Sequence, residues 1–255
     1  MNLRSRLLSE IGIPHVFTLR DPAKPGFGNT SFSFGVATDV LANRAEALRA
    51  MNQDPAHLVL ASQCHGTQIH CVTEADRGRG ALDDAGRLLD GDGLVTDVHG
   101  LPIAVQVADC CCLLIADRGG RAVGAFHAGW RGTYEAMALR AVMSFEKEFG
   151  IPAKDLSAWV SPAISGENYQ VDEELWSKFK GKWGGDSLLA FPYRIDLPGL
   201  NRKQLIETGV PSKNIECSEV CTFNSQYCFS HRRGDSPQGR MLGVIARPNQ
   251  GPLQK

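Results

Sequence analysis

Four strand-like segments follow one another in the middle of the chain, and this run constrains the fold more than any other feature. They are DGLVTD (92–97), PIAVQVAD (102–109), CLLIAD (112–117) and RAVGAFHAG (121–129). Several of them are apolar on both faces, which is typical of strands that lie inside a protein rather than at its surface. The run therefore predicts sheets that are covered on both sides.

Helices surround these strands in the sequence. Helices are predicted over 40–51, 133–149, 172–180 and 200–209, and further strands over 156–164 and 241–246. Thr38 or Asp39 is predicted to cap the first helix, and Thr133 lies near the expected cap of the second. Because strands and helices do not alternate regularly, the pattern favours an α+β fold. We expect a single domain over residues 1–255, with stacked mixed β-sheets flanked by helices as an α/β/β/α layered sandwich.

Composition narrows the classes of function. The 255 residues carry a formal net charge of -1 and include 43% hydrophobic residues, as in an ordinary globular protein. Neither a basic field for nucleic acid nor a long apolar span for a membrane is present in the sequence. The first sixteen residues contain Ser9 and Glu10 within their apolar run, unlike a signal peptide. We therefore expect a cytoplasmic protein with no nucleic-acid or membrane partner.

The eight cysteines are expected to be reduced in that compartment. Three of them, Cys110, Cys111 and Cys112, are consecutive and cannot all serve a disulfide framework. All except Cys110 and Cys221 are interpreted as small buried hydrophobic residues.

Three potential metal ligands stand at the ends of strand-like runs. His65 lies in SQCHG after LVLAS, Cys110 in VADCC after LPIAVQVA, and His127 in FHAGWRG at the end of RAVGAF. Turns just beyond strands are where ligands collect in layered structures. Two imidazoles and one thiolate can hold a zinc ion and leave its fourth position open to water or substrate. The pattern indicates a catalytic metal site, against the alternative of three packed core residues.

The turn after His127 has features of an anion site. Gly129 and Gly132 permit close approach of the backbone, and the segment opens onto a helix N-terminus, whose free N–H groups suit an anion. Arg131 adds a bidentate donor to the same region. The alternative is a tight strand-to-helix turn in which Trp130 is a packing anchor.

The motifs together resemble a known family. They are QCHG, DGLVTD, ADCCCLLIAD, AFHAGWRGT, SPAISGENYQV, RIDLPGLNRKQL and CTFNSQYCFSHRRGDSPQGR, spread from about residue 17 to residue 246. The chain resembles the laccase-domain, or polyphenol oxidoreductase, proteins, whose members are read as multifunctional purine nucleoside phosphorylases and include a peptidoglycan editing factor. The resemblance implies a zinc ion on His65, Cys110 and His127, with copper as an alternative or non-native metal.

The same resemblance implies an activity. Its members cleave adenosine, inosine, guanosine and 5'-methylthioadenosine with phosphate and also deaminate adenosine. For this chain the hypothesis assigns phosphate binding to Arg131, with Arg232 in SHRRGD as a second candidate, and lets Asp109 orient a ligand or shuttle a proton. Cys110, Asp109 and Arg131 are thus the expected catalytic residues. The expected partners are a small-molecule nucleoside and phosphate, and the protein is expected to be a monomer or a homodimer.

The chain also departs from the family pattern. The family usually has Val at the position of Cys64, Leu-Pro at Cys111 and Cys112, and aromatic residues at the positions of Cys228 and His231. The extra thiols bear on the choice of metal and on redox sensitivity. The changes near residues 228–235 bear on contacts with the base or the sugar.

Three other classes of function remain open from the sequence. In a cysteine hydrolase, such as an amidase acting on cell-wall precursors, Cys110 would be the nucleophile and His127 or His65 its base. A copper-dependent polyphenol oxidase (laccase) needs several further imidazoles, commonly as His-x-His pairs, whereas this chain has seven histidines and no such pair. A zinc-stabilised binding module would need a fourth protein ligand, and none is evident.

Overall fold

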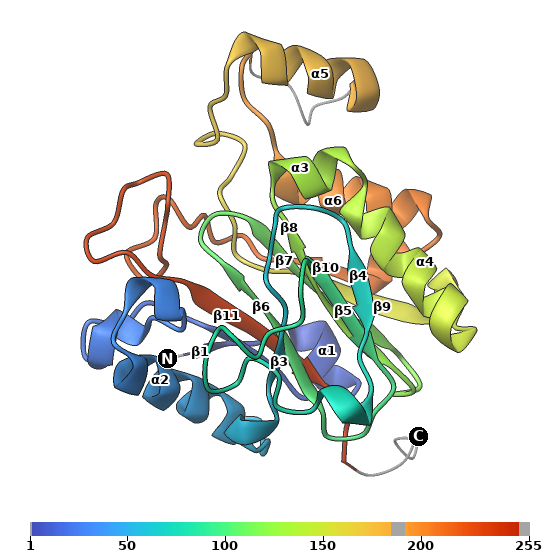
Figure 1. Ribbon diagram of the computed structural model, residues 1–255. Coiled ribbons are helices and arrows are strands. Elements are labelled where there is room, and N and C mark those ends of the chain that lie inside the picture. The colour runs from blue at the N-terminus through green and yellow to red at the C-terminus, as the bar shows by residue number, and fades with distance from the viewer. Residues whose placement is uncertain (1, 185–191, 250–255) are drawn as a thin grey trace.

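Two mixed β-sheets form the centre of the computed structural model (Figure 1), which describes residues 2–184 and 192–249. The five-stranded sheet has the order β1 (Asn2–Leu3), β2 (His15–Thr18), β11 (Met241–Ala246), β6 (Pro102–Val107) and β3 (Val59–Leu60). The six-stranded sheet has the order β10 (Ile215–Cys217), β9 (Leu156–Val160), β7 (Cys111–Asp117), β8 (Val123–Ala128), β5 (Gly93–Thr96) and β4 (Ile69–Cys71). Most neighbours are antiparallel, while β3 with β6, β4 with β5, and β10 with β9 are parallel.

The helices of the described residues lie around these sheets. They are α1 (Arg6–Glu10), α2 (Ala37–Arg49), α3 (Trp130–Tyr134), α4 (Met137–Phe149), α5 (Glu173–Trp183) and α6 (Leu197–Glu207). Short 3-10 turns occur at Pro25–Gly28, Phe32–Phe34, Pro55–His57, Glu74–Asp76, Ala153–Asp155 and Ser212–Asn214. Within residues 2–184 and 192–249, no helix combines the length and the apolar character needed to cross a membrane.

The strands are apolar on both faces because each face meets a different core. On β7, Cys112 and Leu114 point into the core between the two sheets, while Leu113 and Ile115 point into the core beneath α4 and α6. On β11, Leu242 belongs to a third core that also includes residues of α2. Figure 1 shows α2 on one side of the paired sheets and α4 with α6 on the other. The predicted α+β fold with an α/β/β/α layering is confirmed.

Two details of the helix predictions are wrong. The helix expected over 133–149 is broken: α3 ends at Tyr134, Ala136 takes a left-handed backbone with φ 62°, and α4 begins at Met137. Thr133 is therefore inside α3, where its hydroxyl oxygen accepts a hydrogen bond from Asn201 at 2.9 Å. For the helix expected over 40–51, α2 begins earlier, after Val36, and no side chain caps it.

The strand ends that carry the predicted ligands meet at one edge of the two sheets. β3 and β6 run parallel, so their carboxyl ends, which lead to His65 and Cys110, lie on the same side. Cys110 follows β6 and precedes β7, and therefore stands where the chain passes from one sheet to the other. The register of β7 with β8 places Cys112 opposite His127. The connection between the sheets thus brings segments far apart in the sequence together.

Candidate metal centre

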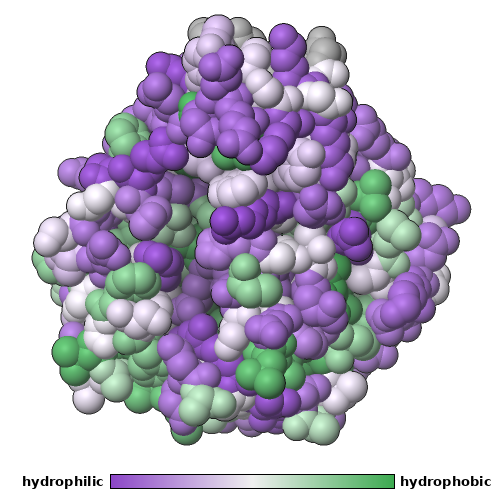
Figure 2. Space-filling model, turned by 45° about the horizontal axis from the view of Figure 1, so that its top comes forward, coloured by the Kyte–Doolittle hydropathy of each residue, from purple (hydrophilic) through white to green (hydrophobic). Residues whose placement is uncertain are grey.

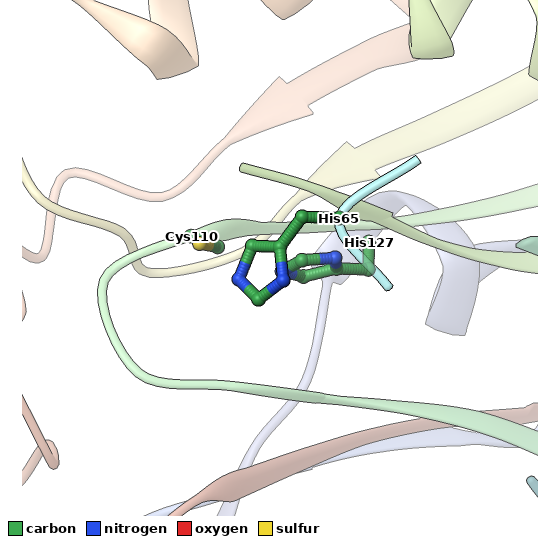
Figure 3. Close-up of side chains that lie close together, drawn as sticks. All are labelled: His65, Cys110 and His127. Carbon is green, nitrogen blue, oxygen red and sulfur yellow. The ribbon is translucent and has the colours of Figure 1, made fainter. Parts of the chain in front are cut away.

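The side chains of His65, Cys110 and His127 converge. Their ligand atoms all lie within 4.8 Å of one another. The two imidazole rings stand nearly perpendicular, with centroids 4.8 Å apart. Figure 3 shows the two rings beside each other, with the thiol of Cys110 facing them from the turn between β6 and β7. His65 is exposed, Cys110 is half-buried and His127 is buried, so the cluster is open to solvent on the side of His65.

Gly129 leaves the space in front of this cluster free. A Cβ atom at Gly129 would lie 2.9 Å from Sγ of Cys110, 3.4 Å from Cδ2 of His65 and 3.6 Å from Cε1 of His127. A soft or borderline divalent ion suits two imidazole nitrogens and a thiolate. Both the donor set and the absence of a side chain at Gly129 therefore fit a bound metal ion.

Replacing Gly129 by alanine should consequently weaken metal binding. The added methyl group would be closer to Sγ of Cys110 than non-bonded atoms allow and would displace the thiol from its position. We expect at least about a tenfold lower metal affinity, comparable with the loss of a supporting residue. Titration of the metal-free protein with Zn²⁺ measures the change. A Gly181→Ala variant is the control, because a Cβ there meets no other atom within 4 Å, and equal affinities of the two variants would refute this explanation.

Asp92 orients His127 from behind the cluster. Its carboxylate is fully buried and accepts a hydrogen bond of 2.6 Å from Nδ1 of His127. Burial by itself would raise the pKa of Asp92, but the hydrogen bond and the positive charge of His127 lower it to about 2. Because Nδ1 carries the proton, Nε2 of His127 is left as the ligand atom. This is the usual relation between a supporting carboxylate and a metal-binding histidine.

The same carboxylate shapes the loop that carries His65. It accepts backbone hydrogen bonds from Cys64 at 3.1 Å, His65 at 3.0 Å and Gly66 at 2.7 Å. It also accepts the thiol of Cys64 at 3.2 Å. His65 has a left-handed backbone with φ 61°, a conformation that local sequence does not favour and that these bonds stabilise. Asp92 therefore positions two of the three ligands.

Asp92 is not among the site residues predicted from the sequence. The residue stands directly before β5, and β5 pairs with β8 so that Gly93 lies opposite Phe126, next to His127. The sequence shows an acidic residue directly before a buried strand, but only the pairing of β5 with β8 places this residue next to His127.

The thiol of Cys110 ionises readily in this environment. Burial opposes the thiolate, but the charge of His127 and hydrogen bonds from His127 and His65 lower the pKa of Cys110 to about 6. Burial likewise disfavours the charged form of His127, yet the thiolate and Asp92 raise its pKa to about 9. In the absence of metal the two groups favour a thiolate and imidazolium pair. A metal ion would replace the shared proton.

Asp109 adopts an unusual backbone and supports a distant loop. Its φ is 83°, and its carboxylate accepts hydrogen bonds from the hydroxyls of Thr222 at 2.6 Å and Ser230 at 3.1 Å and from the backbone N–H of Arg232 at 2.7 Å. These contacts fasten the segment between β10 and β11 beside Cys110. A role in orienting a ligand or moving a proton stays a prediction for Asp109.

The two predicted arginines are exposed, and each has its guanidinium over an aromatic ring. Arg131 is exposed on α3, and its guanidinium carbon lies 4.5 Å from the centre of the Trp130 ring. Arg232 is also exposed, and its guanidinium carbon lies 5.0 Å from the centre of the Tyr169 ring. Figure 2 shows one face of the molecule with a hollow left of its centre, rimmed largely by hydrophilic side chains. Binding of phosphate by these arginines stays a prediction.

The other cysteines only partly match the expectation of small buried residues. Cys111 and Cys112 are fully buried on opposite faces of β7, and Cys228 is also buried. In contrast, Cys64 and Cys71 are exposed, and the expectation was wrong for them. The thiol of Cys64 donates to the carboxylate of Asp92 at 3.2 Å in the loop that carries His65.

The fold carries an open cluster of three side chains that could hold one metal ion. Solved structures share the fold: YlmD from Geobacillus stearothermophilus matches with a TM-score of 0.86 and 31% identity, covering 96% of this chain and 94% of that one. The hypothetical protein YfiH from Bacillus licheniformis matches with a TM-score of 0.84 and 29% identity, covering 94% and 93%. The family model described as multi-copper polyphenol oxidoreductase laccase matches residues 23–248, and the chain belongs to this family.

Curated relatives of the family carry another name. The purine nucleoside phosphorylase YlmD of Geobacillus stearothermophilus is 35% identical over 217 residues, covering 82% of this chain and 79% of the relative. The purine nucleoside phosphorylase of Bacteroides thetaiotaomicron is 30% identical over 226 residues, covering 86% and 84%. The predicted family resemblance is confirmed.

Proposed function

We propose that the protein is a zinc-dependent purine nucleoside phosphorylase that acts on adenosine, inosine, guanosine and 5'-methylthioadenosine and also deaminates adenosine. The observation that carries the proposal is the convergence of His65, Cys110 and His127 in a cluster that is open on the side of His65. Arg131 follows His127 by four residues, and the backbone N–H of Arg232 donates to Asp109, the neighbour of Cys110. The names of the curated relatives support the phosphorylase activity. In this reaction an oxygen of hydrogen phosphate bonds to C1' of the sugar, and the bond from C1' to the purine nitrogen breaks with its electron pair going to the nitrogen. The proton that the phosphate loses balances the proton that the purine nitrogen takes up, and the products are the sugar 1-phosphate and the neutral base.

The residues of the chain would contribute mainly by positioning and charge. His65, Cys110 and His127 would hold the zinc ion, which supplies a Lewis acid when bound. Arg131 and Arg232 would hold phosphate close to the sugar, and their positive charges would stabilise the negative charge that develops on the leaving base. Asp109 would keep Arg232 in place through the backbone hydrogen bond of 2.7 Å.

Metal analysis combined with product analysis tests the proposal. The purified protein should contain one zinc ion per chain and should convert inosine to hypoxanthine and ribose 1-phosphate only when phosphate is present. Adenosine should additionally give inosine. A chelator should remove both activities, and added Zn²⁺ should restore them. If neither product forms with fully zinc-loaded protein, the phosphorylase proposal is wrong.

The proposed phosphate site makes a specific prediction for Arg131. Replacing Arg131 by alanine should raise KM for phosphate about 10- to 100-fold, because a charge-assisted contact to the anion is lost, and should change KM for inosine much less. Steady-state rates at varied phosphate and varied inosine give both constants. Arg118→Ala is the control, because Arg118 is exposed beyond the far end of β7. An equal rise in both constants would exclude the assigned role.

A cysteine hydrolase, such as an amidase for cell-wall precursors, is a second candidate. It is favoured by the lowered pKa of Cys110 and by the hydrogen bonds that this thiol receives from His127 and His65. Such an enzyme would remain active after complete removal of metal and would be inactivated by alkylation of Cys110. The phosphorylase proposal expects the opposite response to a chelator.

Copper-dependent oxidation is less well supported by the site. Across residues 2–184 and 192–249, the groups of three or more His, Cys, Asp or Glu able to hold a metal amount to this one cluster. A multi-copper oxidase needs further imidazole ligands for its additional copper ions. Copper bound in the His65 cluster would be seen in the metal analysis.

We also propose a compartment, an oligomeric state and the partners of the protein. We place it in the cytoplasm, acting as a monomer or a homodimer on small molecules, without a nucleic-acid or membrane partner. The net charge of -1 supports the absence of a nucleic-acid partner.

A further inference from the structure

A pocket of about 550 Å³ is lined by Trp130, which follows His127 by three residues in the chain. Its walls come from the start of α3, from the segment 169–172 with the first turn of α5, and from the loop that joins β10 to β11. Trp130, Tyr169 and Arg232 line it together with Gln170, Val171, Asp172 and Leu175. A mixture of aromatic, apolar and charged side chains in a concave site is typical of a small-molecule site.

Two residues that line this pocket are linked to residues next to the predicted metal ligands, one along the chain and one by a hydrogen bond. Trp130 directly follows Gly129, whose backbone lies against all three ligand side chains. Arg232 is fastened by its backbone N–H to Asp109, the neighbour of Cys110. A molecule in the pocket would therefore be in reach of the metal position.

Tyr169 faces the same region. The ring is half-buried and is covered by the guanidinium of Arg232 at 5.0 Å. Burial, followed by the nearby negative charge of Cys110, raises the pKa of the Tyr169 hydroxyl to about 12. The hydroxyl is thus a neutral group near the thiolate, and the ring offers an apolar surface beside it. The Trp130 ring has a similar arrangement with Arg131 at 4.5 Å.

The loop before Tyr169 is held in place by further hydrogen bonds. Sγ of Cys221 accepts the backbone N–H of Ser165 at 3.3 Å and the side-chain amide of Asn168 at 3.5 Å. The backbone N–H of Tyr169 itself donates to the carbonyl of Ser165 at 3.0 Å. Tyr169 therefore stands on a fixed turn, and its ring is positioned before a ligand binds.

Two aromatic rings and two guanidinium groups match the two substrates of a nucleoside phosphorylase. The rings suit the purine base, and the guanidinium groups suit phosphate. Flat heteroaromatic bases stack on aromatic side chains, and guanidinium groups bind oxyanions. We propose that Trp130 and Tyr169 form the subsite for the purine base, whereas Arg131 and Arg232 face the phosphate. This inference rests on the proposed phosphorylase function, because it takes a purine nucleoside as the substrate.

Three tyrosine variants of the zinc-loaded protein test the subsite. Tyr169→Ala removes the ring and should raise KM for inosine about 10- to 100-fold, whereas KM for phosphate should change less than about twofold. Tyr169→Phe keeps the ring and should stay within about threefold of the unmodified protein. Tyr227→Ala is the matched control, because Tyr227 is 53% exposed and does not line the pocket. An unchanged KM for inosine in Tyr169→Ala, or an equal rise in both constants, would overturn the inference.

A binding measurement separates this inference from the proposed function. Calorimetric titration of the zinc-loaded protein with inosine, hypoxanthine and ribose, without phosphate, should show binding of the first two and none of ribose. Tyr169→Ala should weaken the binding of hypoxanthine and inosine by the same factor as it raises KM for inosine. Absence of phosphorolysis with intact, Tyr169-dependent hypoxanthine binding would refute only the activity. Phosphorolysis with binding insensitive to Tyr169 would refute only the subsite. If Tyr169→Ala proves unfolded in a thermal melt, Trp130→Leu replaces it with the same expected outcomes.

Discussion

The Cys110→Ala protein is expected to lose its metal and at least about 100-fold of its phosphorolysis activity. In the proposed site, Cys110 would supply a sulfur ligand, and His65 and His127 would each supply an imidazole nitrogen. Two imidazoles alone would hold a divalent ion weakly, and loss of even a supporting residue reduces metal affinity or activity by about 10- to 100-fold. Metal content per chain and initial rates with inosine and phosphate measure the two effects on the same sample.

The control for this variant is Cys71→Ala. Cys71 is an exposed cysteine on the edge strand β4 and is not part of the ligand cluster. It should retain both metal and activity. Full metal content in an inactive Cys110→Ala protein would contradict the metal-ligand role and would instead support Cys110 as a covalent nucleophile.

The second large effect is expected for Asp92→Ala. This change removes the acceptor for Nδ1 of His127 and for three backbone N–H groups of residues 64–66. We expect metal affinity to fall about 10- to 100-fold, since the imidazole is no longer held in its orientation. The free energy of unfolding should also decrease by about 2 kcal/mol or more, because buried donors lose their partner. Zinc titration and chemical denaturation of the metal-free protein measure these effects separately.

Asp90→Asn is the matched control for Asp92. Asp90 is two residues away and exposed, and it has a left-handed backbone with φ 42° that asparagine tolerates. It should leave metal affinity and stability nearly unchanged. Normal zinc affinity in Asp92→Ala, despite reduced stability, would show that the carboxylate supports the fold without orienting His127.

The strands were the most predictable part of the fold. An observed strand lies at each of the four predicted segments, 92–97, 102–109, 112–117 and 121–129. Short runs that are apolar on both faces are typical of buried strands, so these segments were recognisable. Helices over 172–180 and 200–209 were also found, with ends shifted by a few residues. The break at Ala136 was missed, since the apolar spacing of 133–149 continues through it and nothing in the local pattern marks a left-handed residue.

The candidate site was predictable only in part. His65, Cys110 and His127 stand out because soft donors at strand ends are recognisable residue by residue, and the structure brings them together. Asp92 was missed because a carboxylate at a strand start has many potential partners. The position of Tyr169 near Arg232 and Cys110 could not be predicted either, because these residues are far from Tyr169 in the sequence.

The order of residues alone thus settles which segments become strands and which side chains have the chemistry of metal ligands, because both depend on side-chain type and short-range periodicity. Strand pairing decides the remaining features. The pairing of β5 with β8 places Asp92 behind His127, and the passage from β6 to β7 places Cys110 between the two sheets. Hydrogen-bond registers and the packing of two sheets join residues distant in sequence, and these long-range contacts form only in the folded chain.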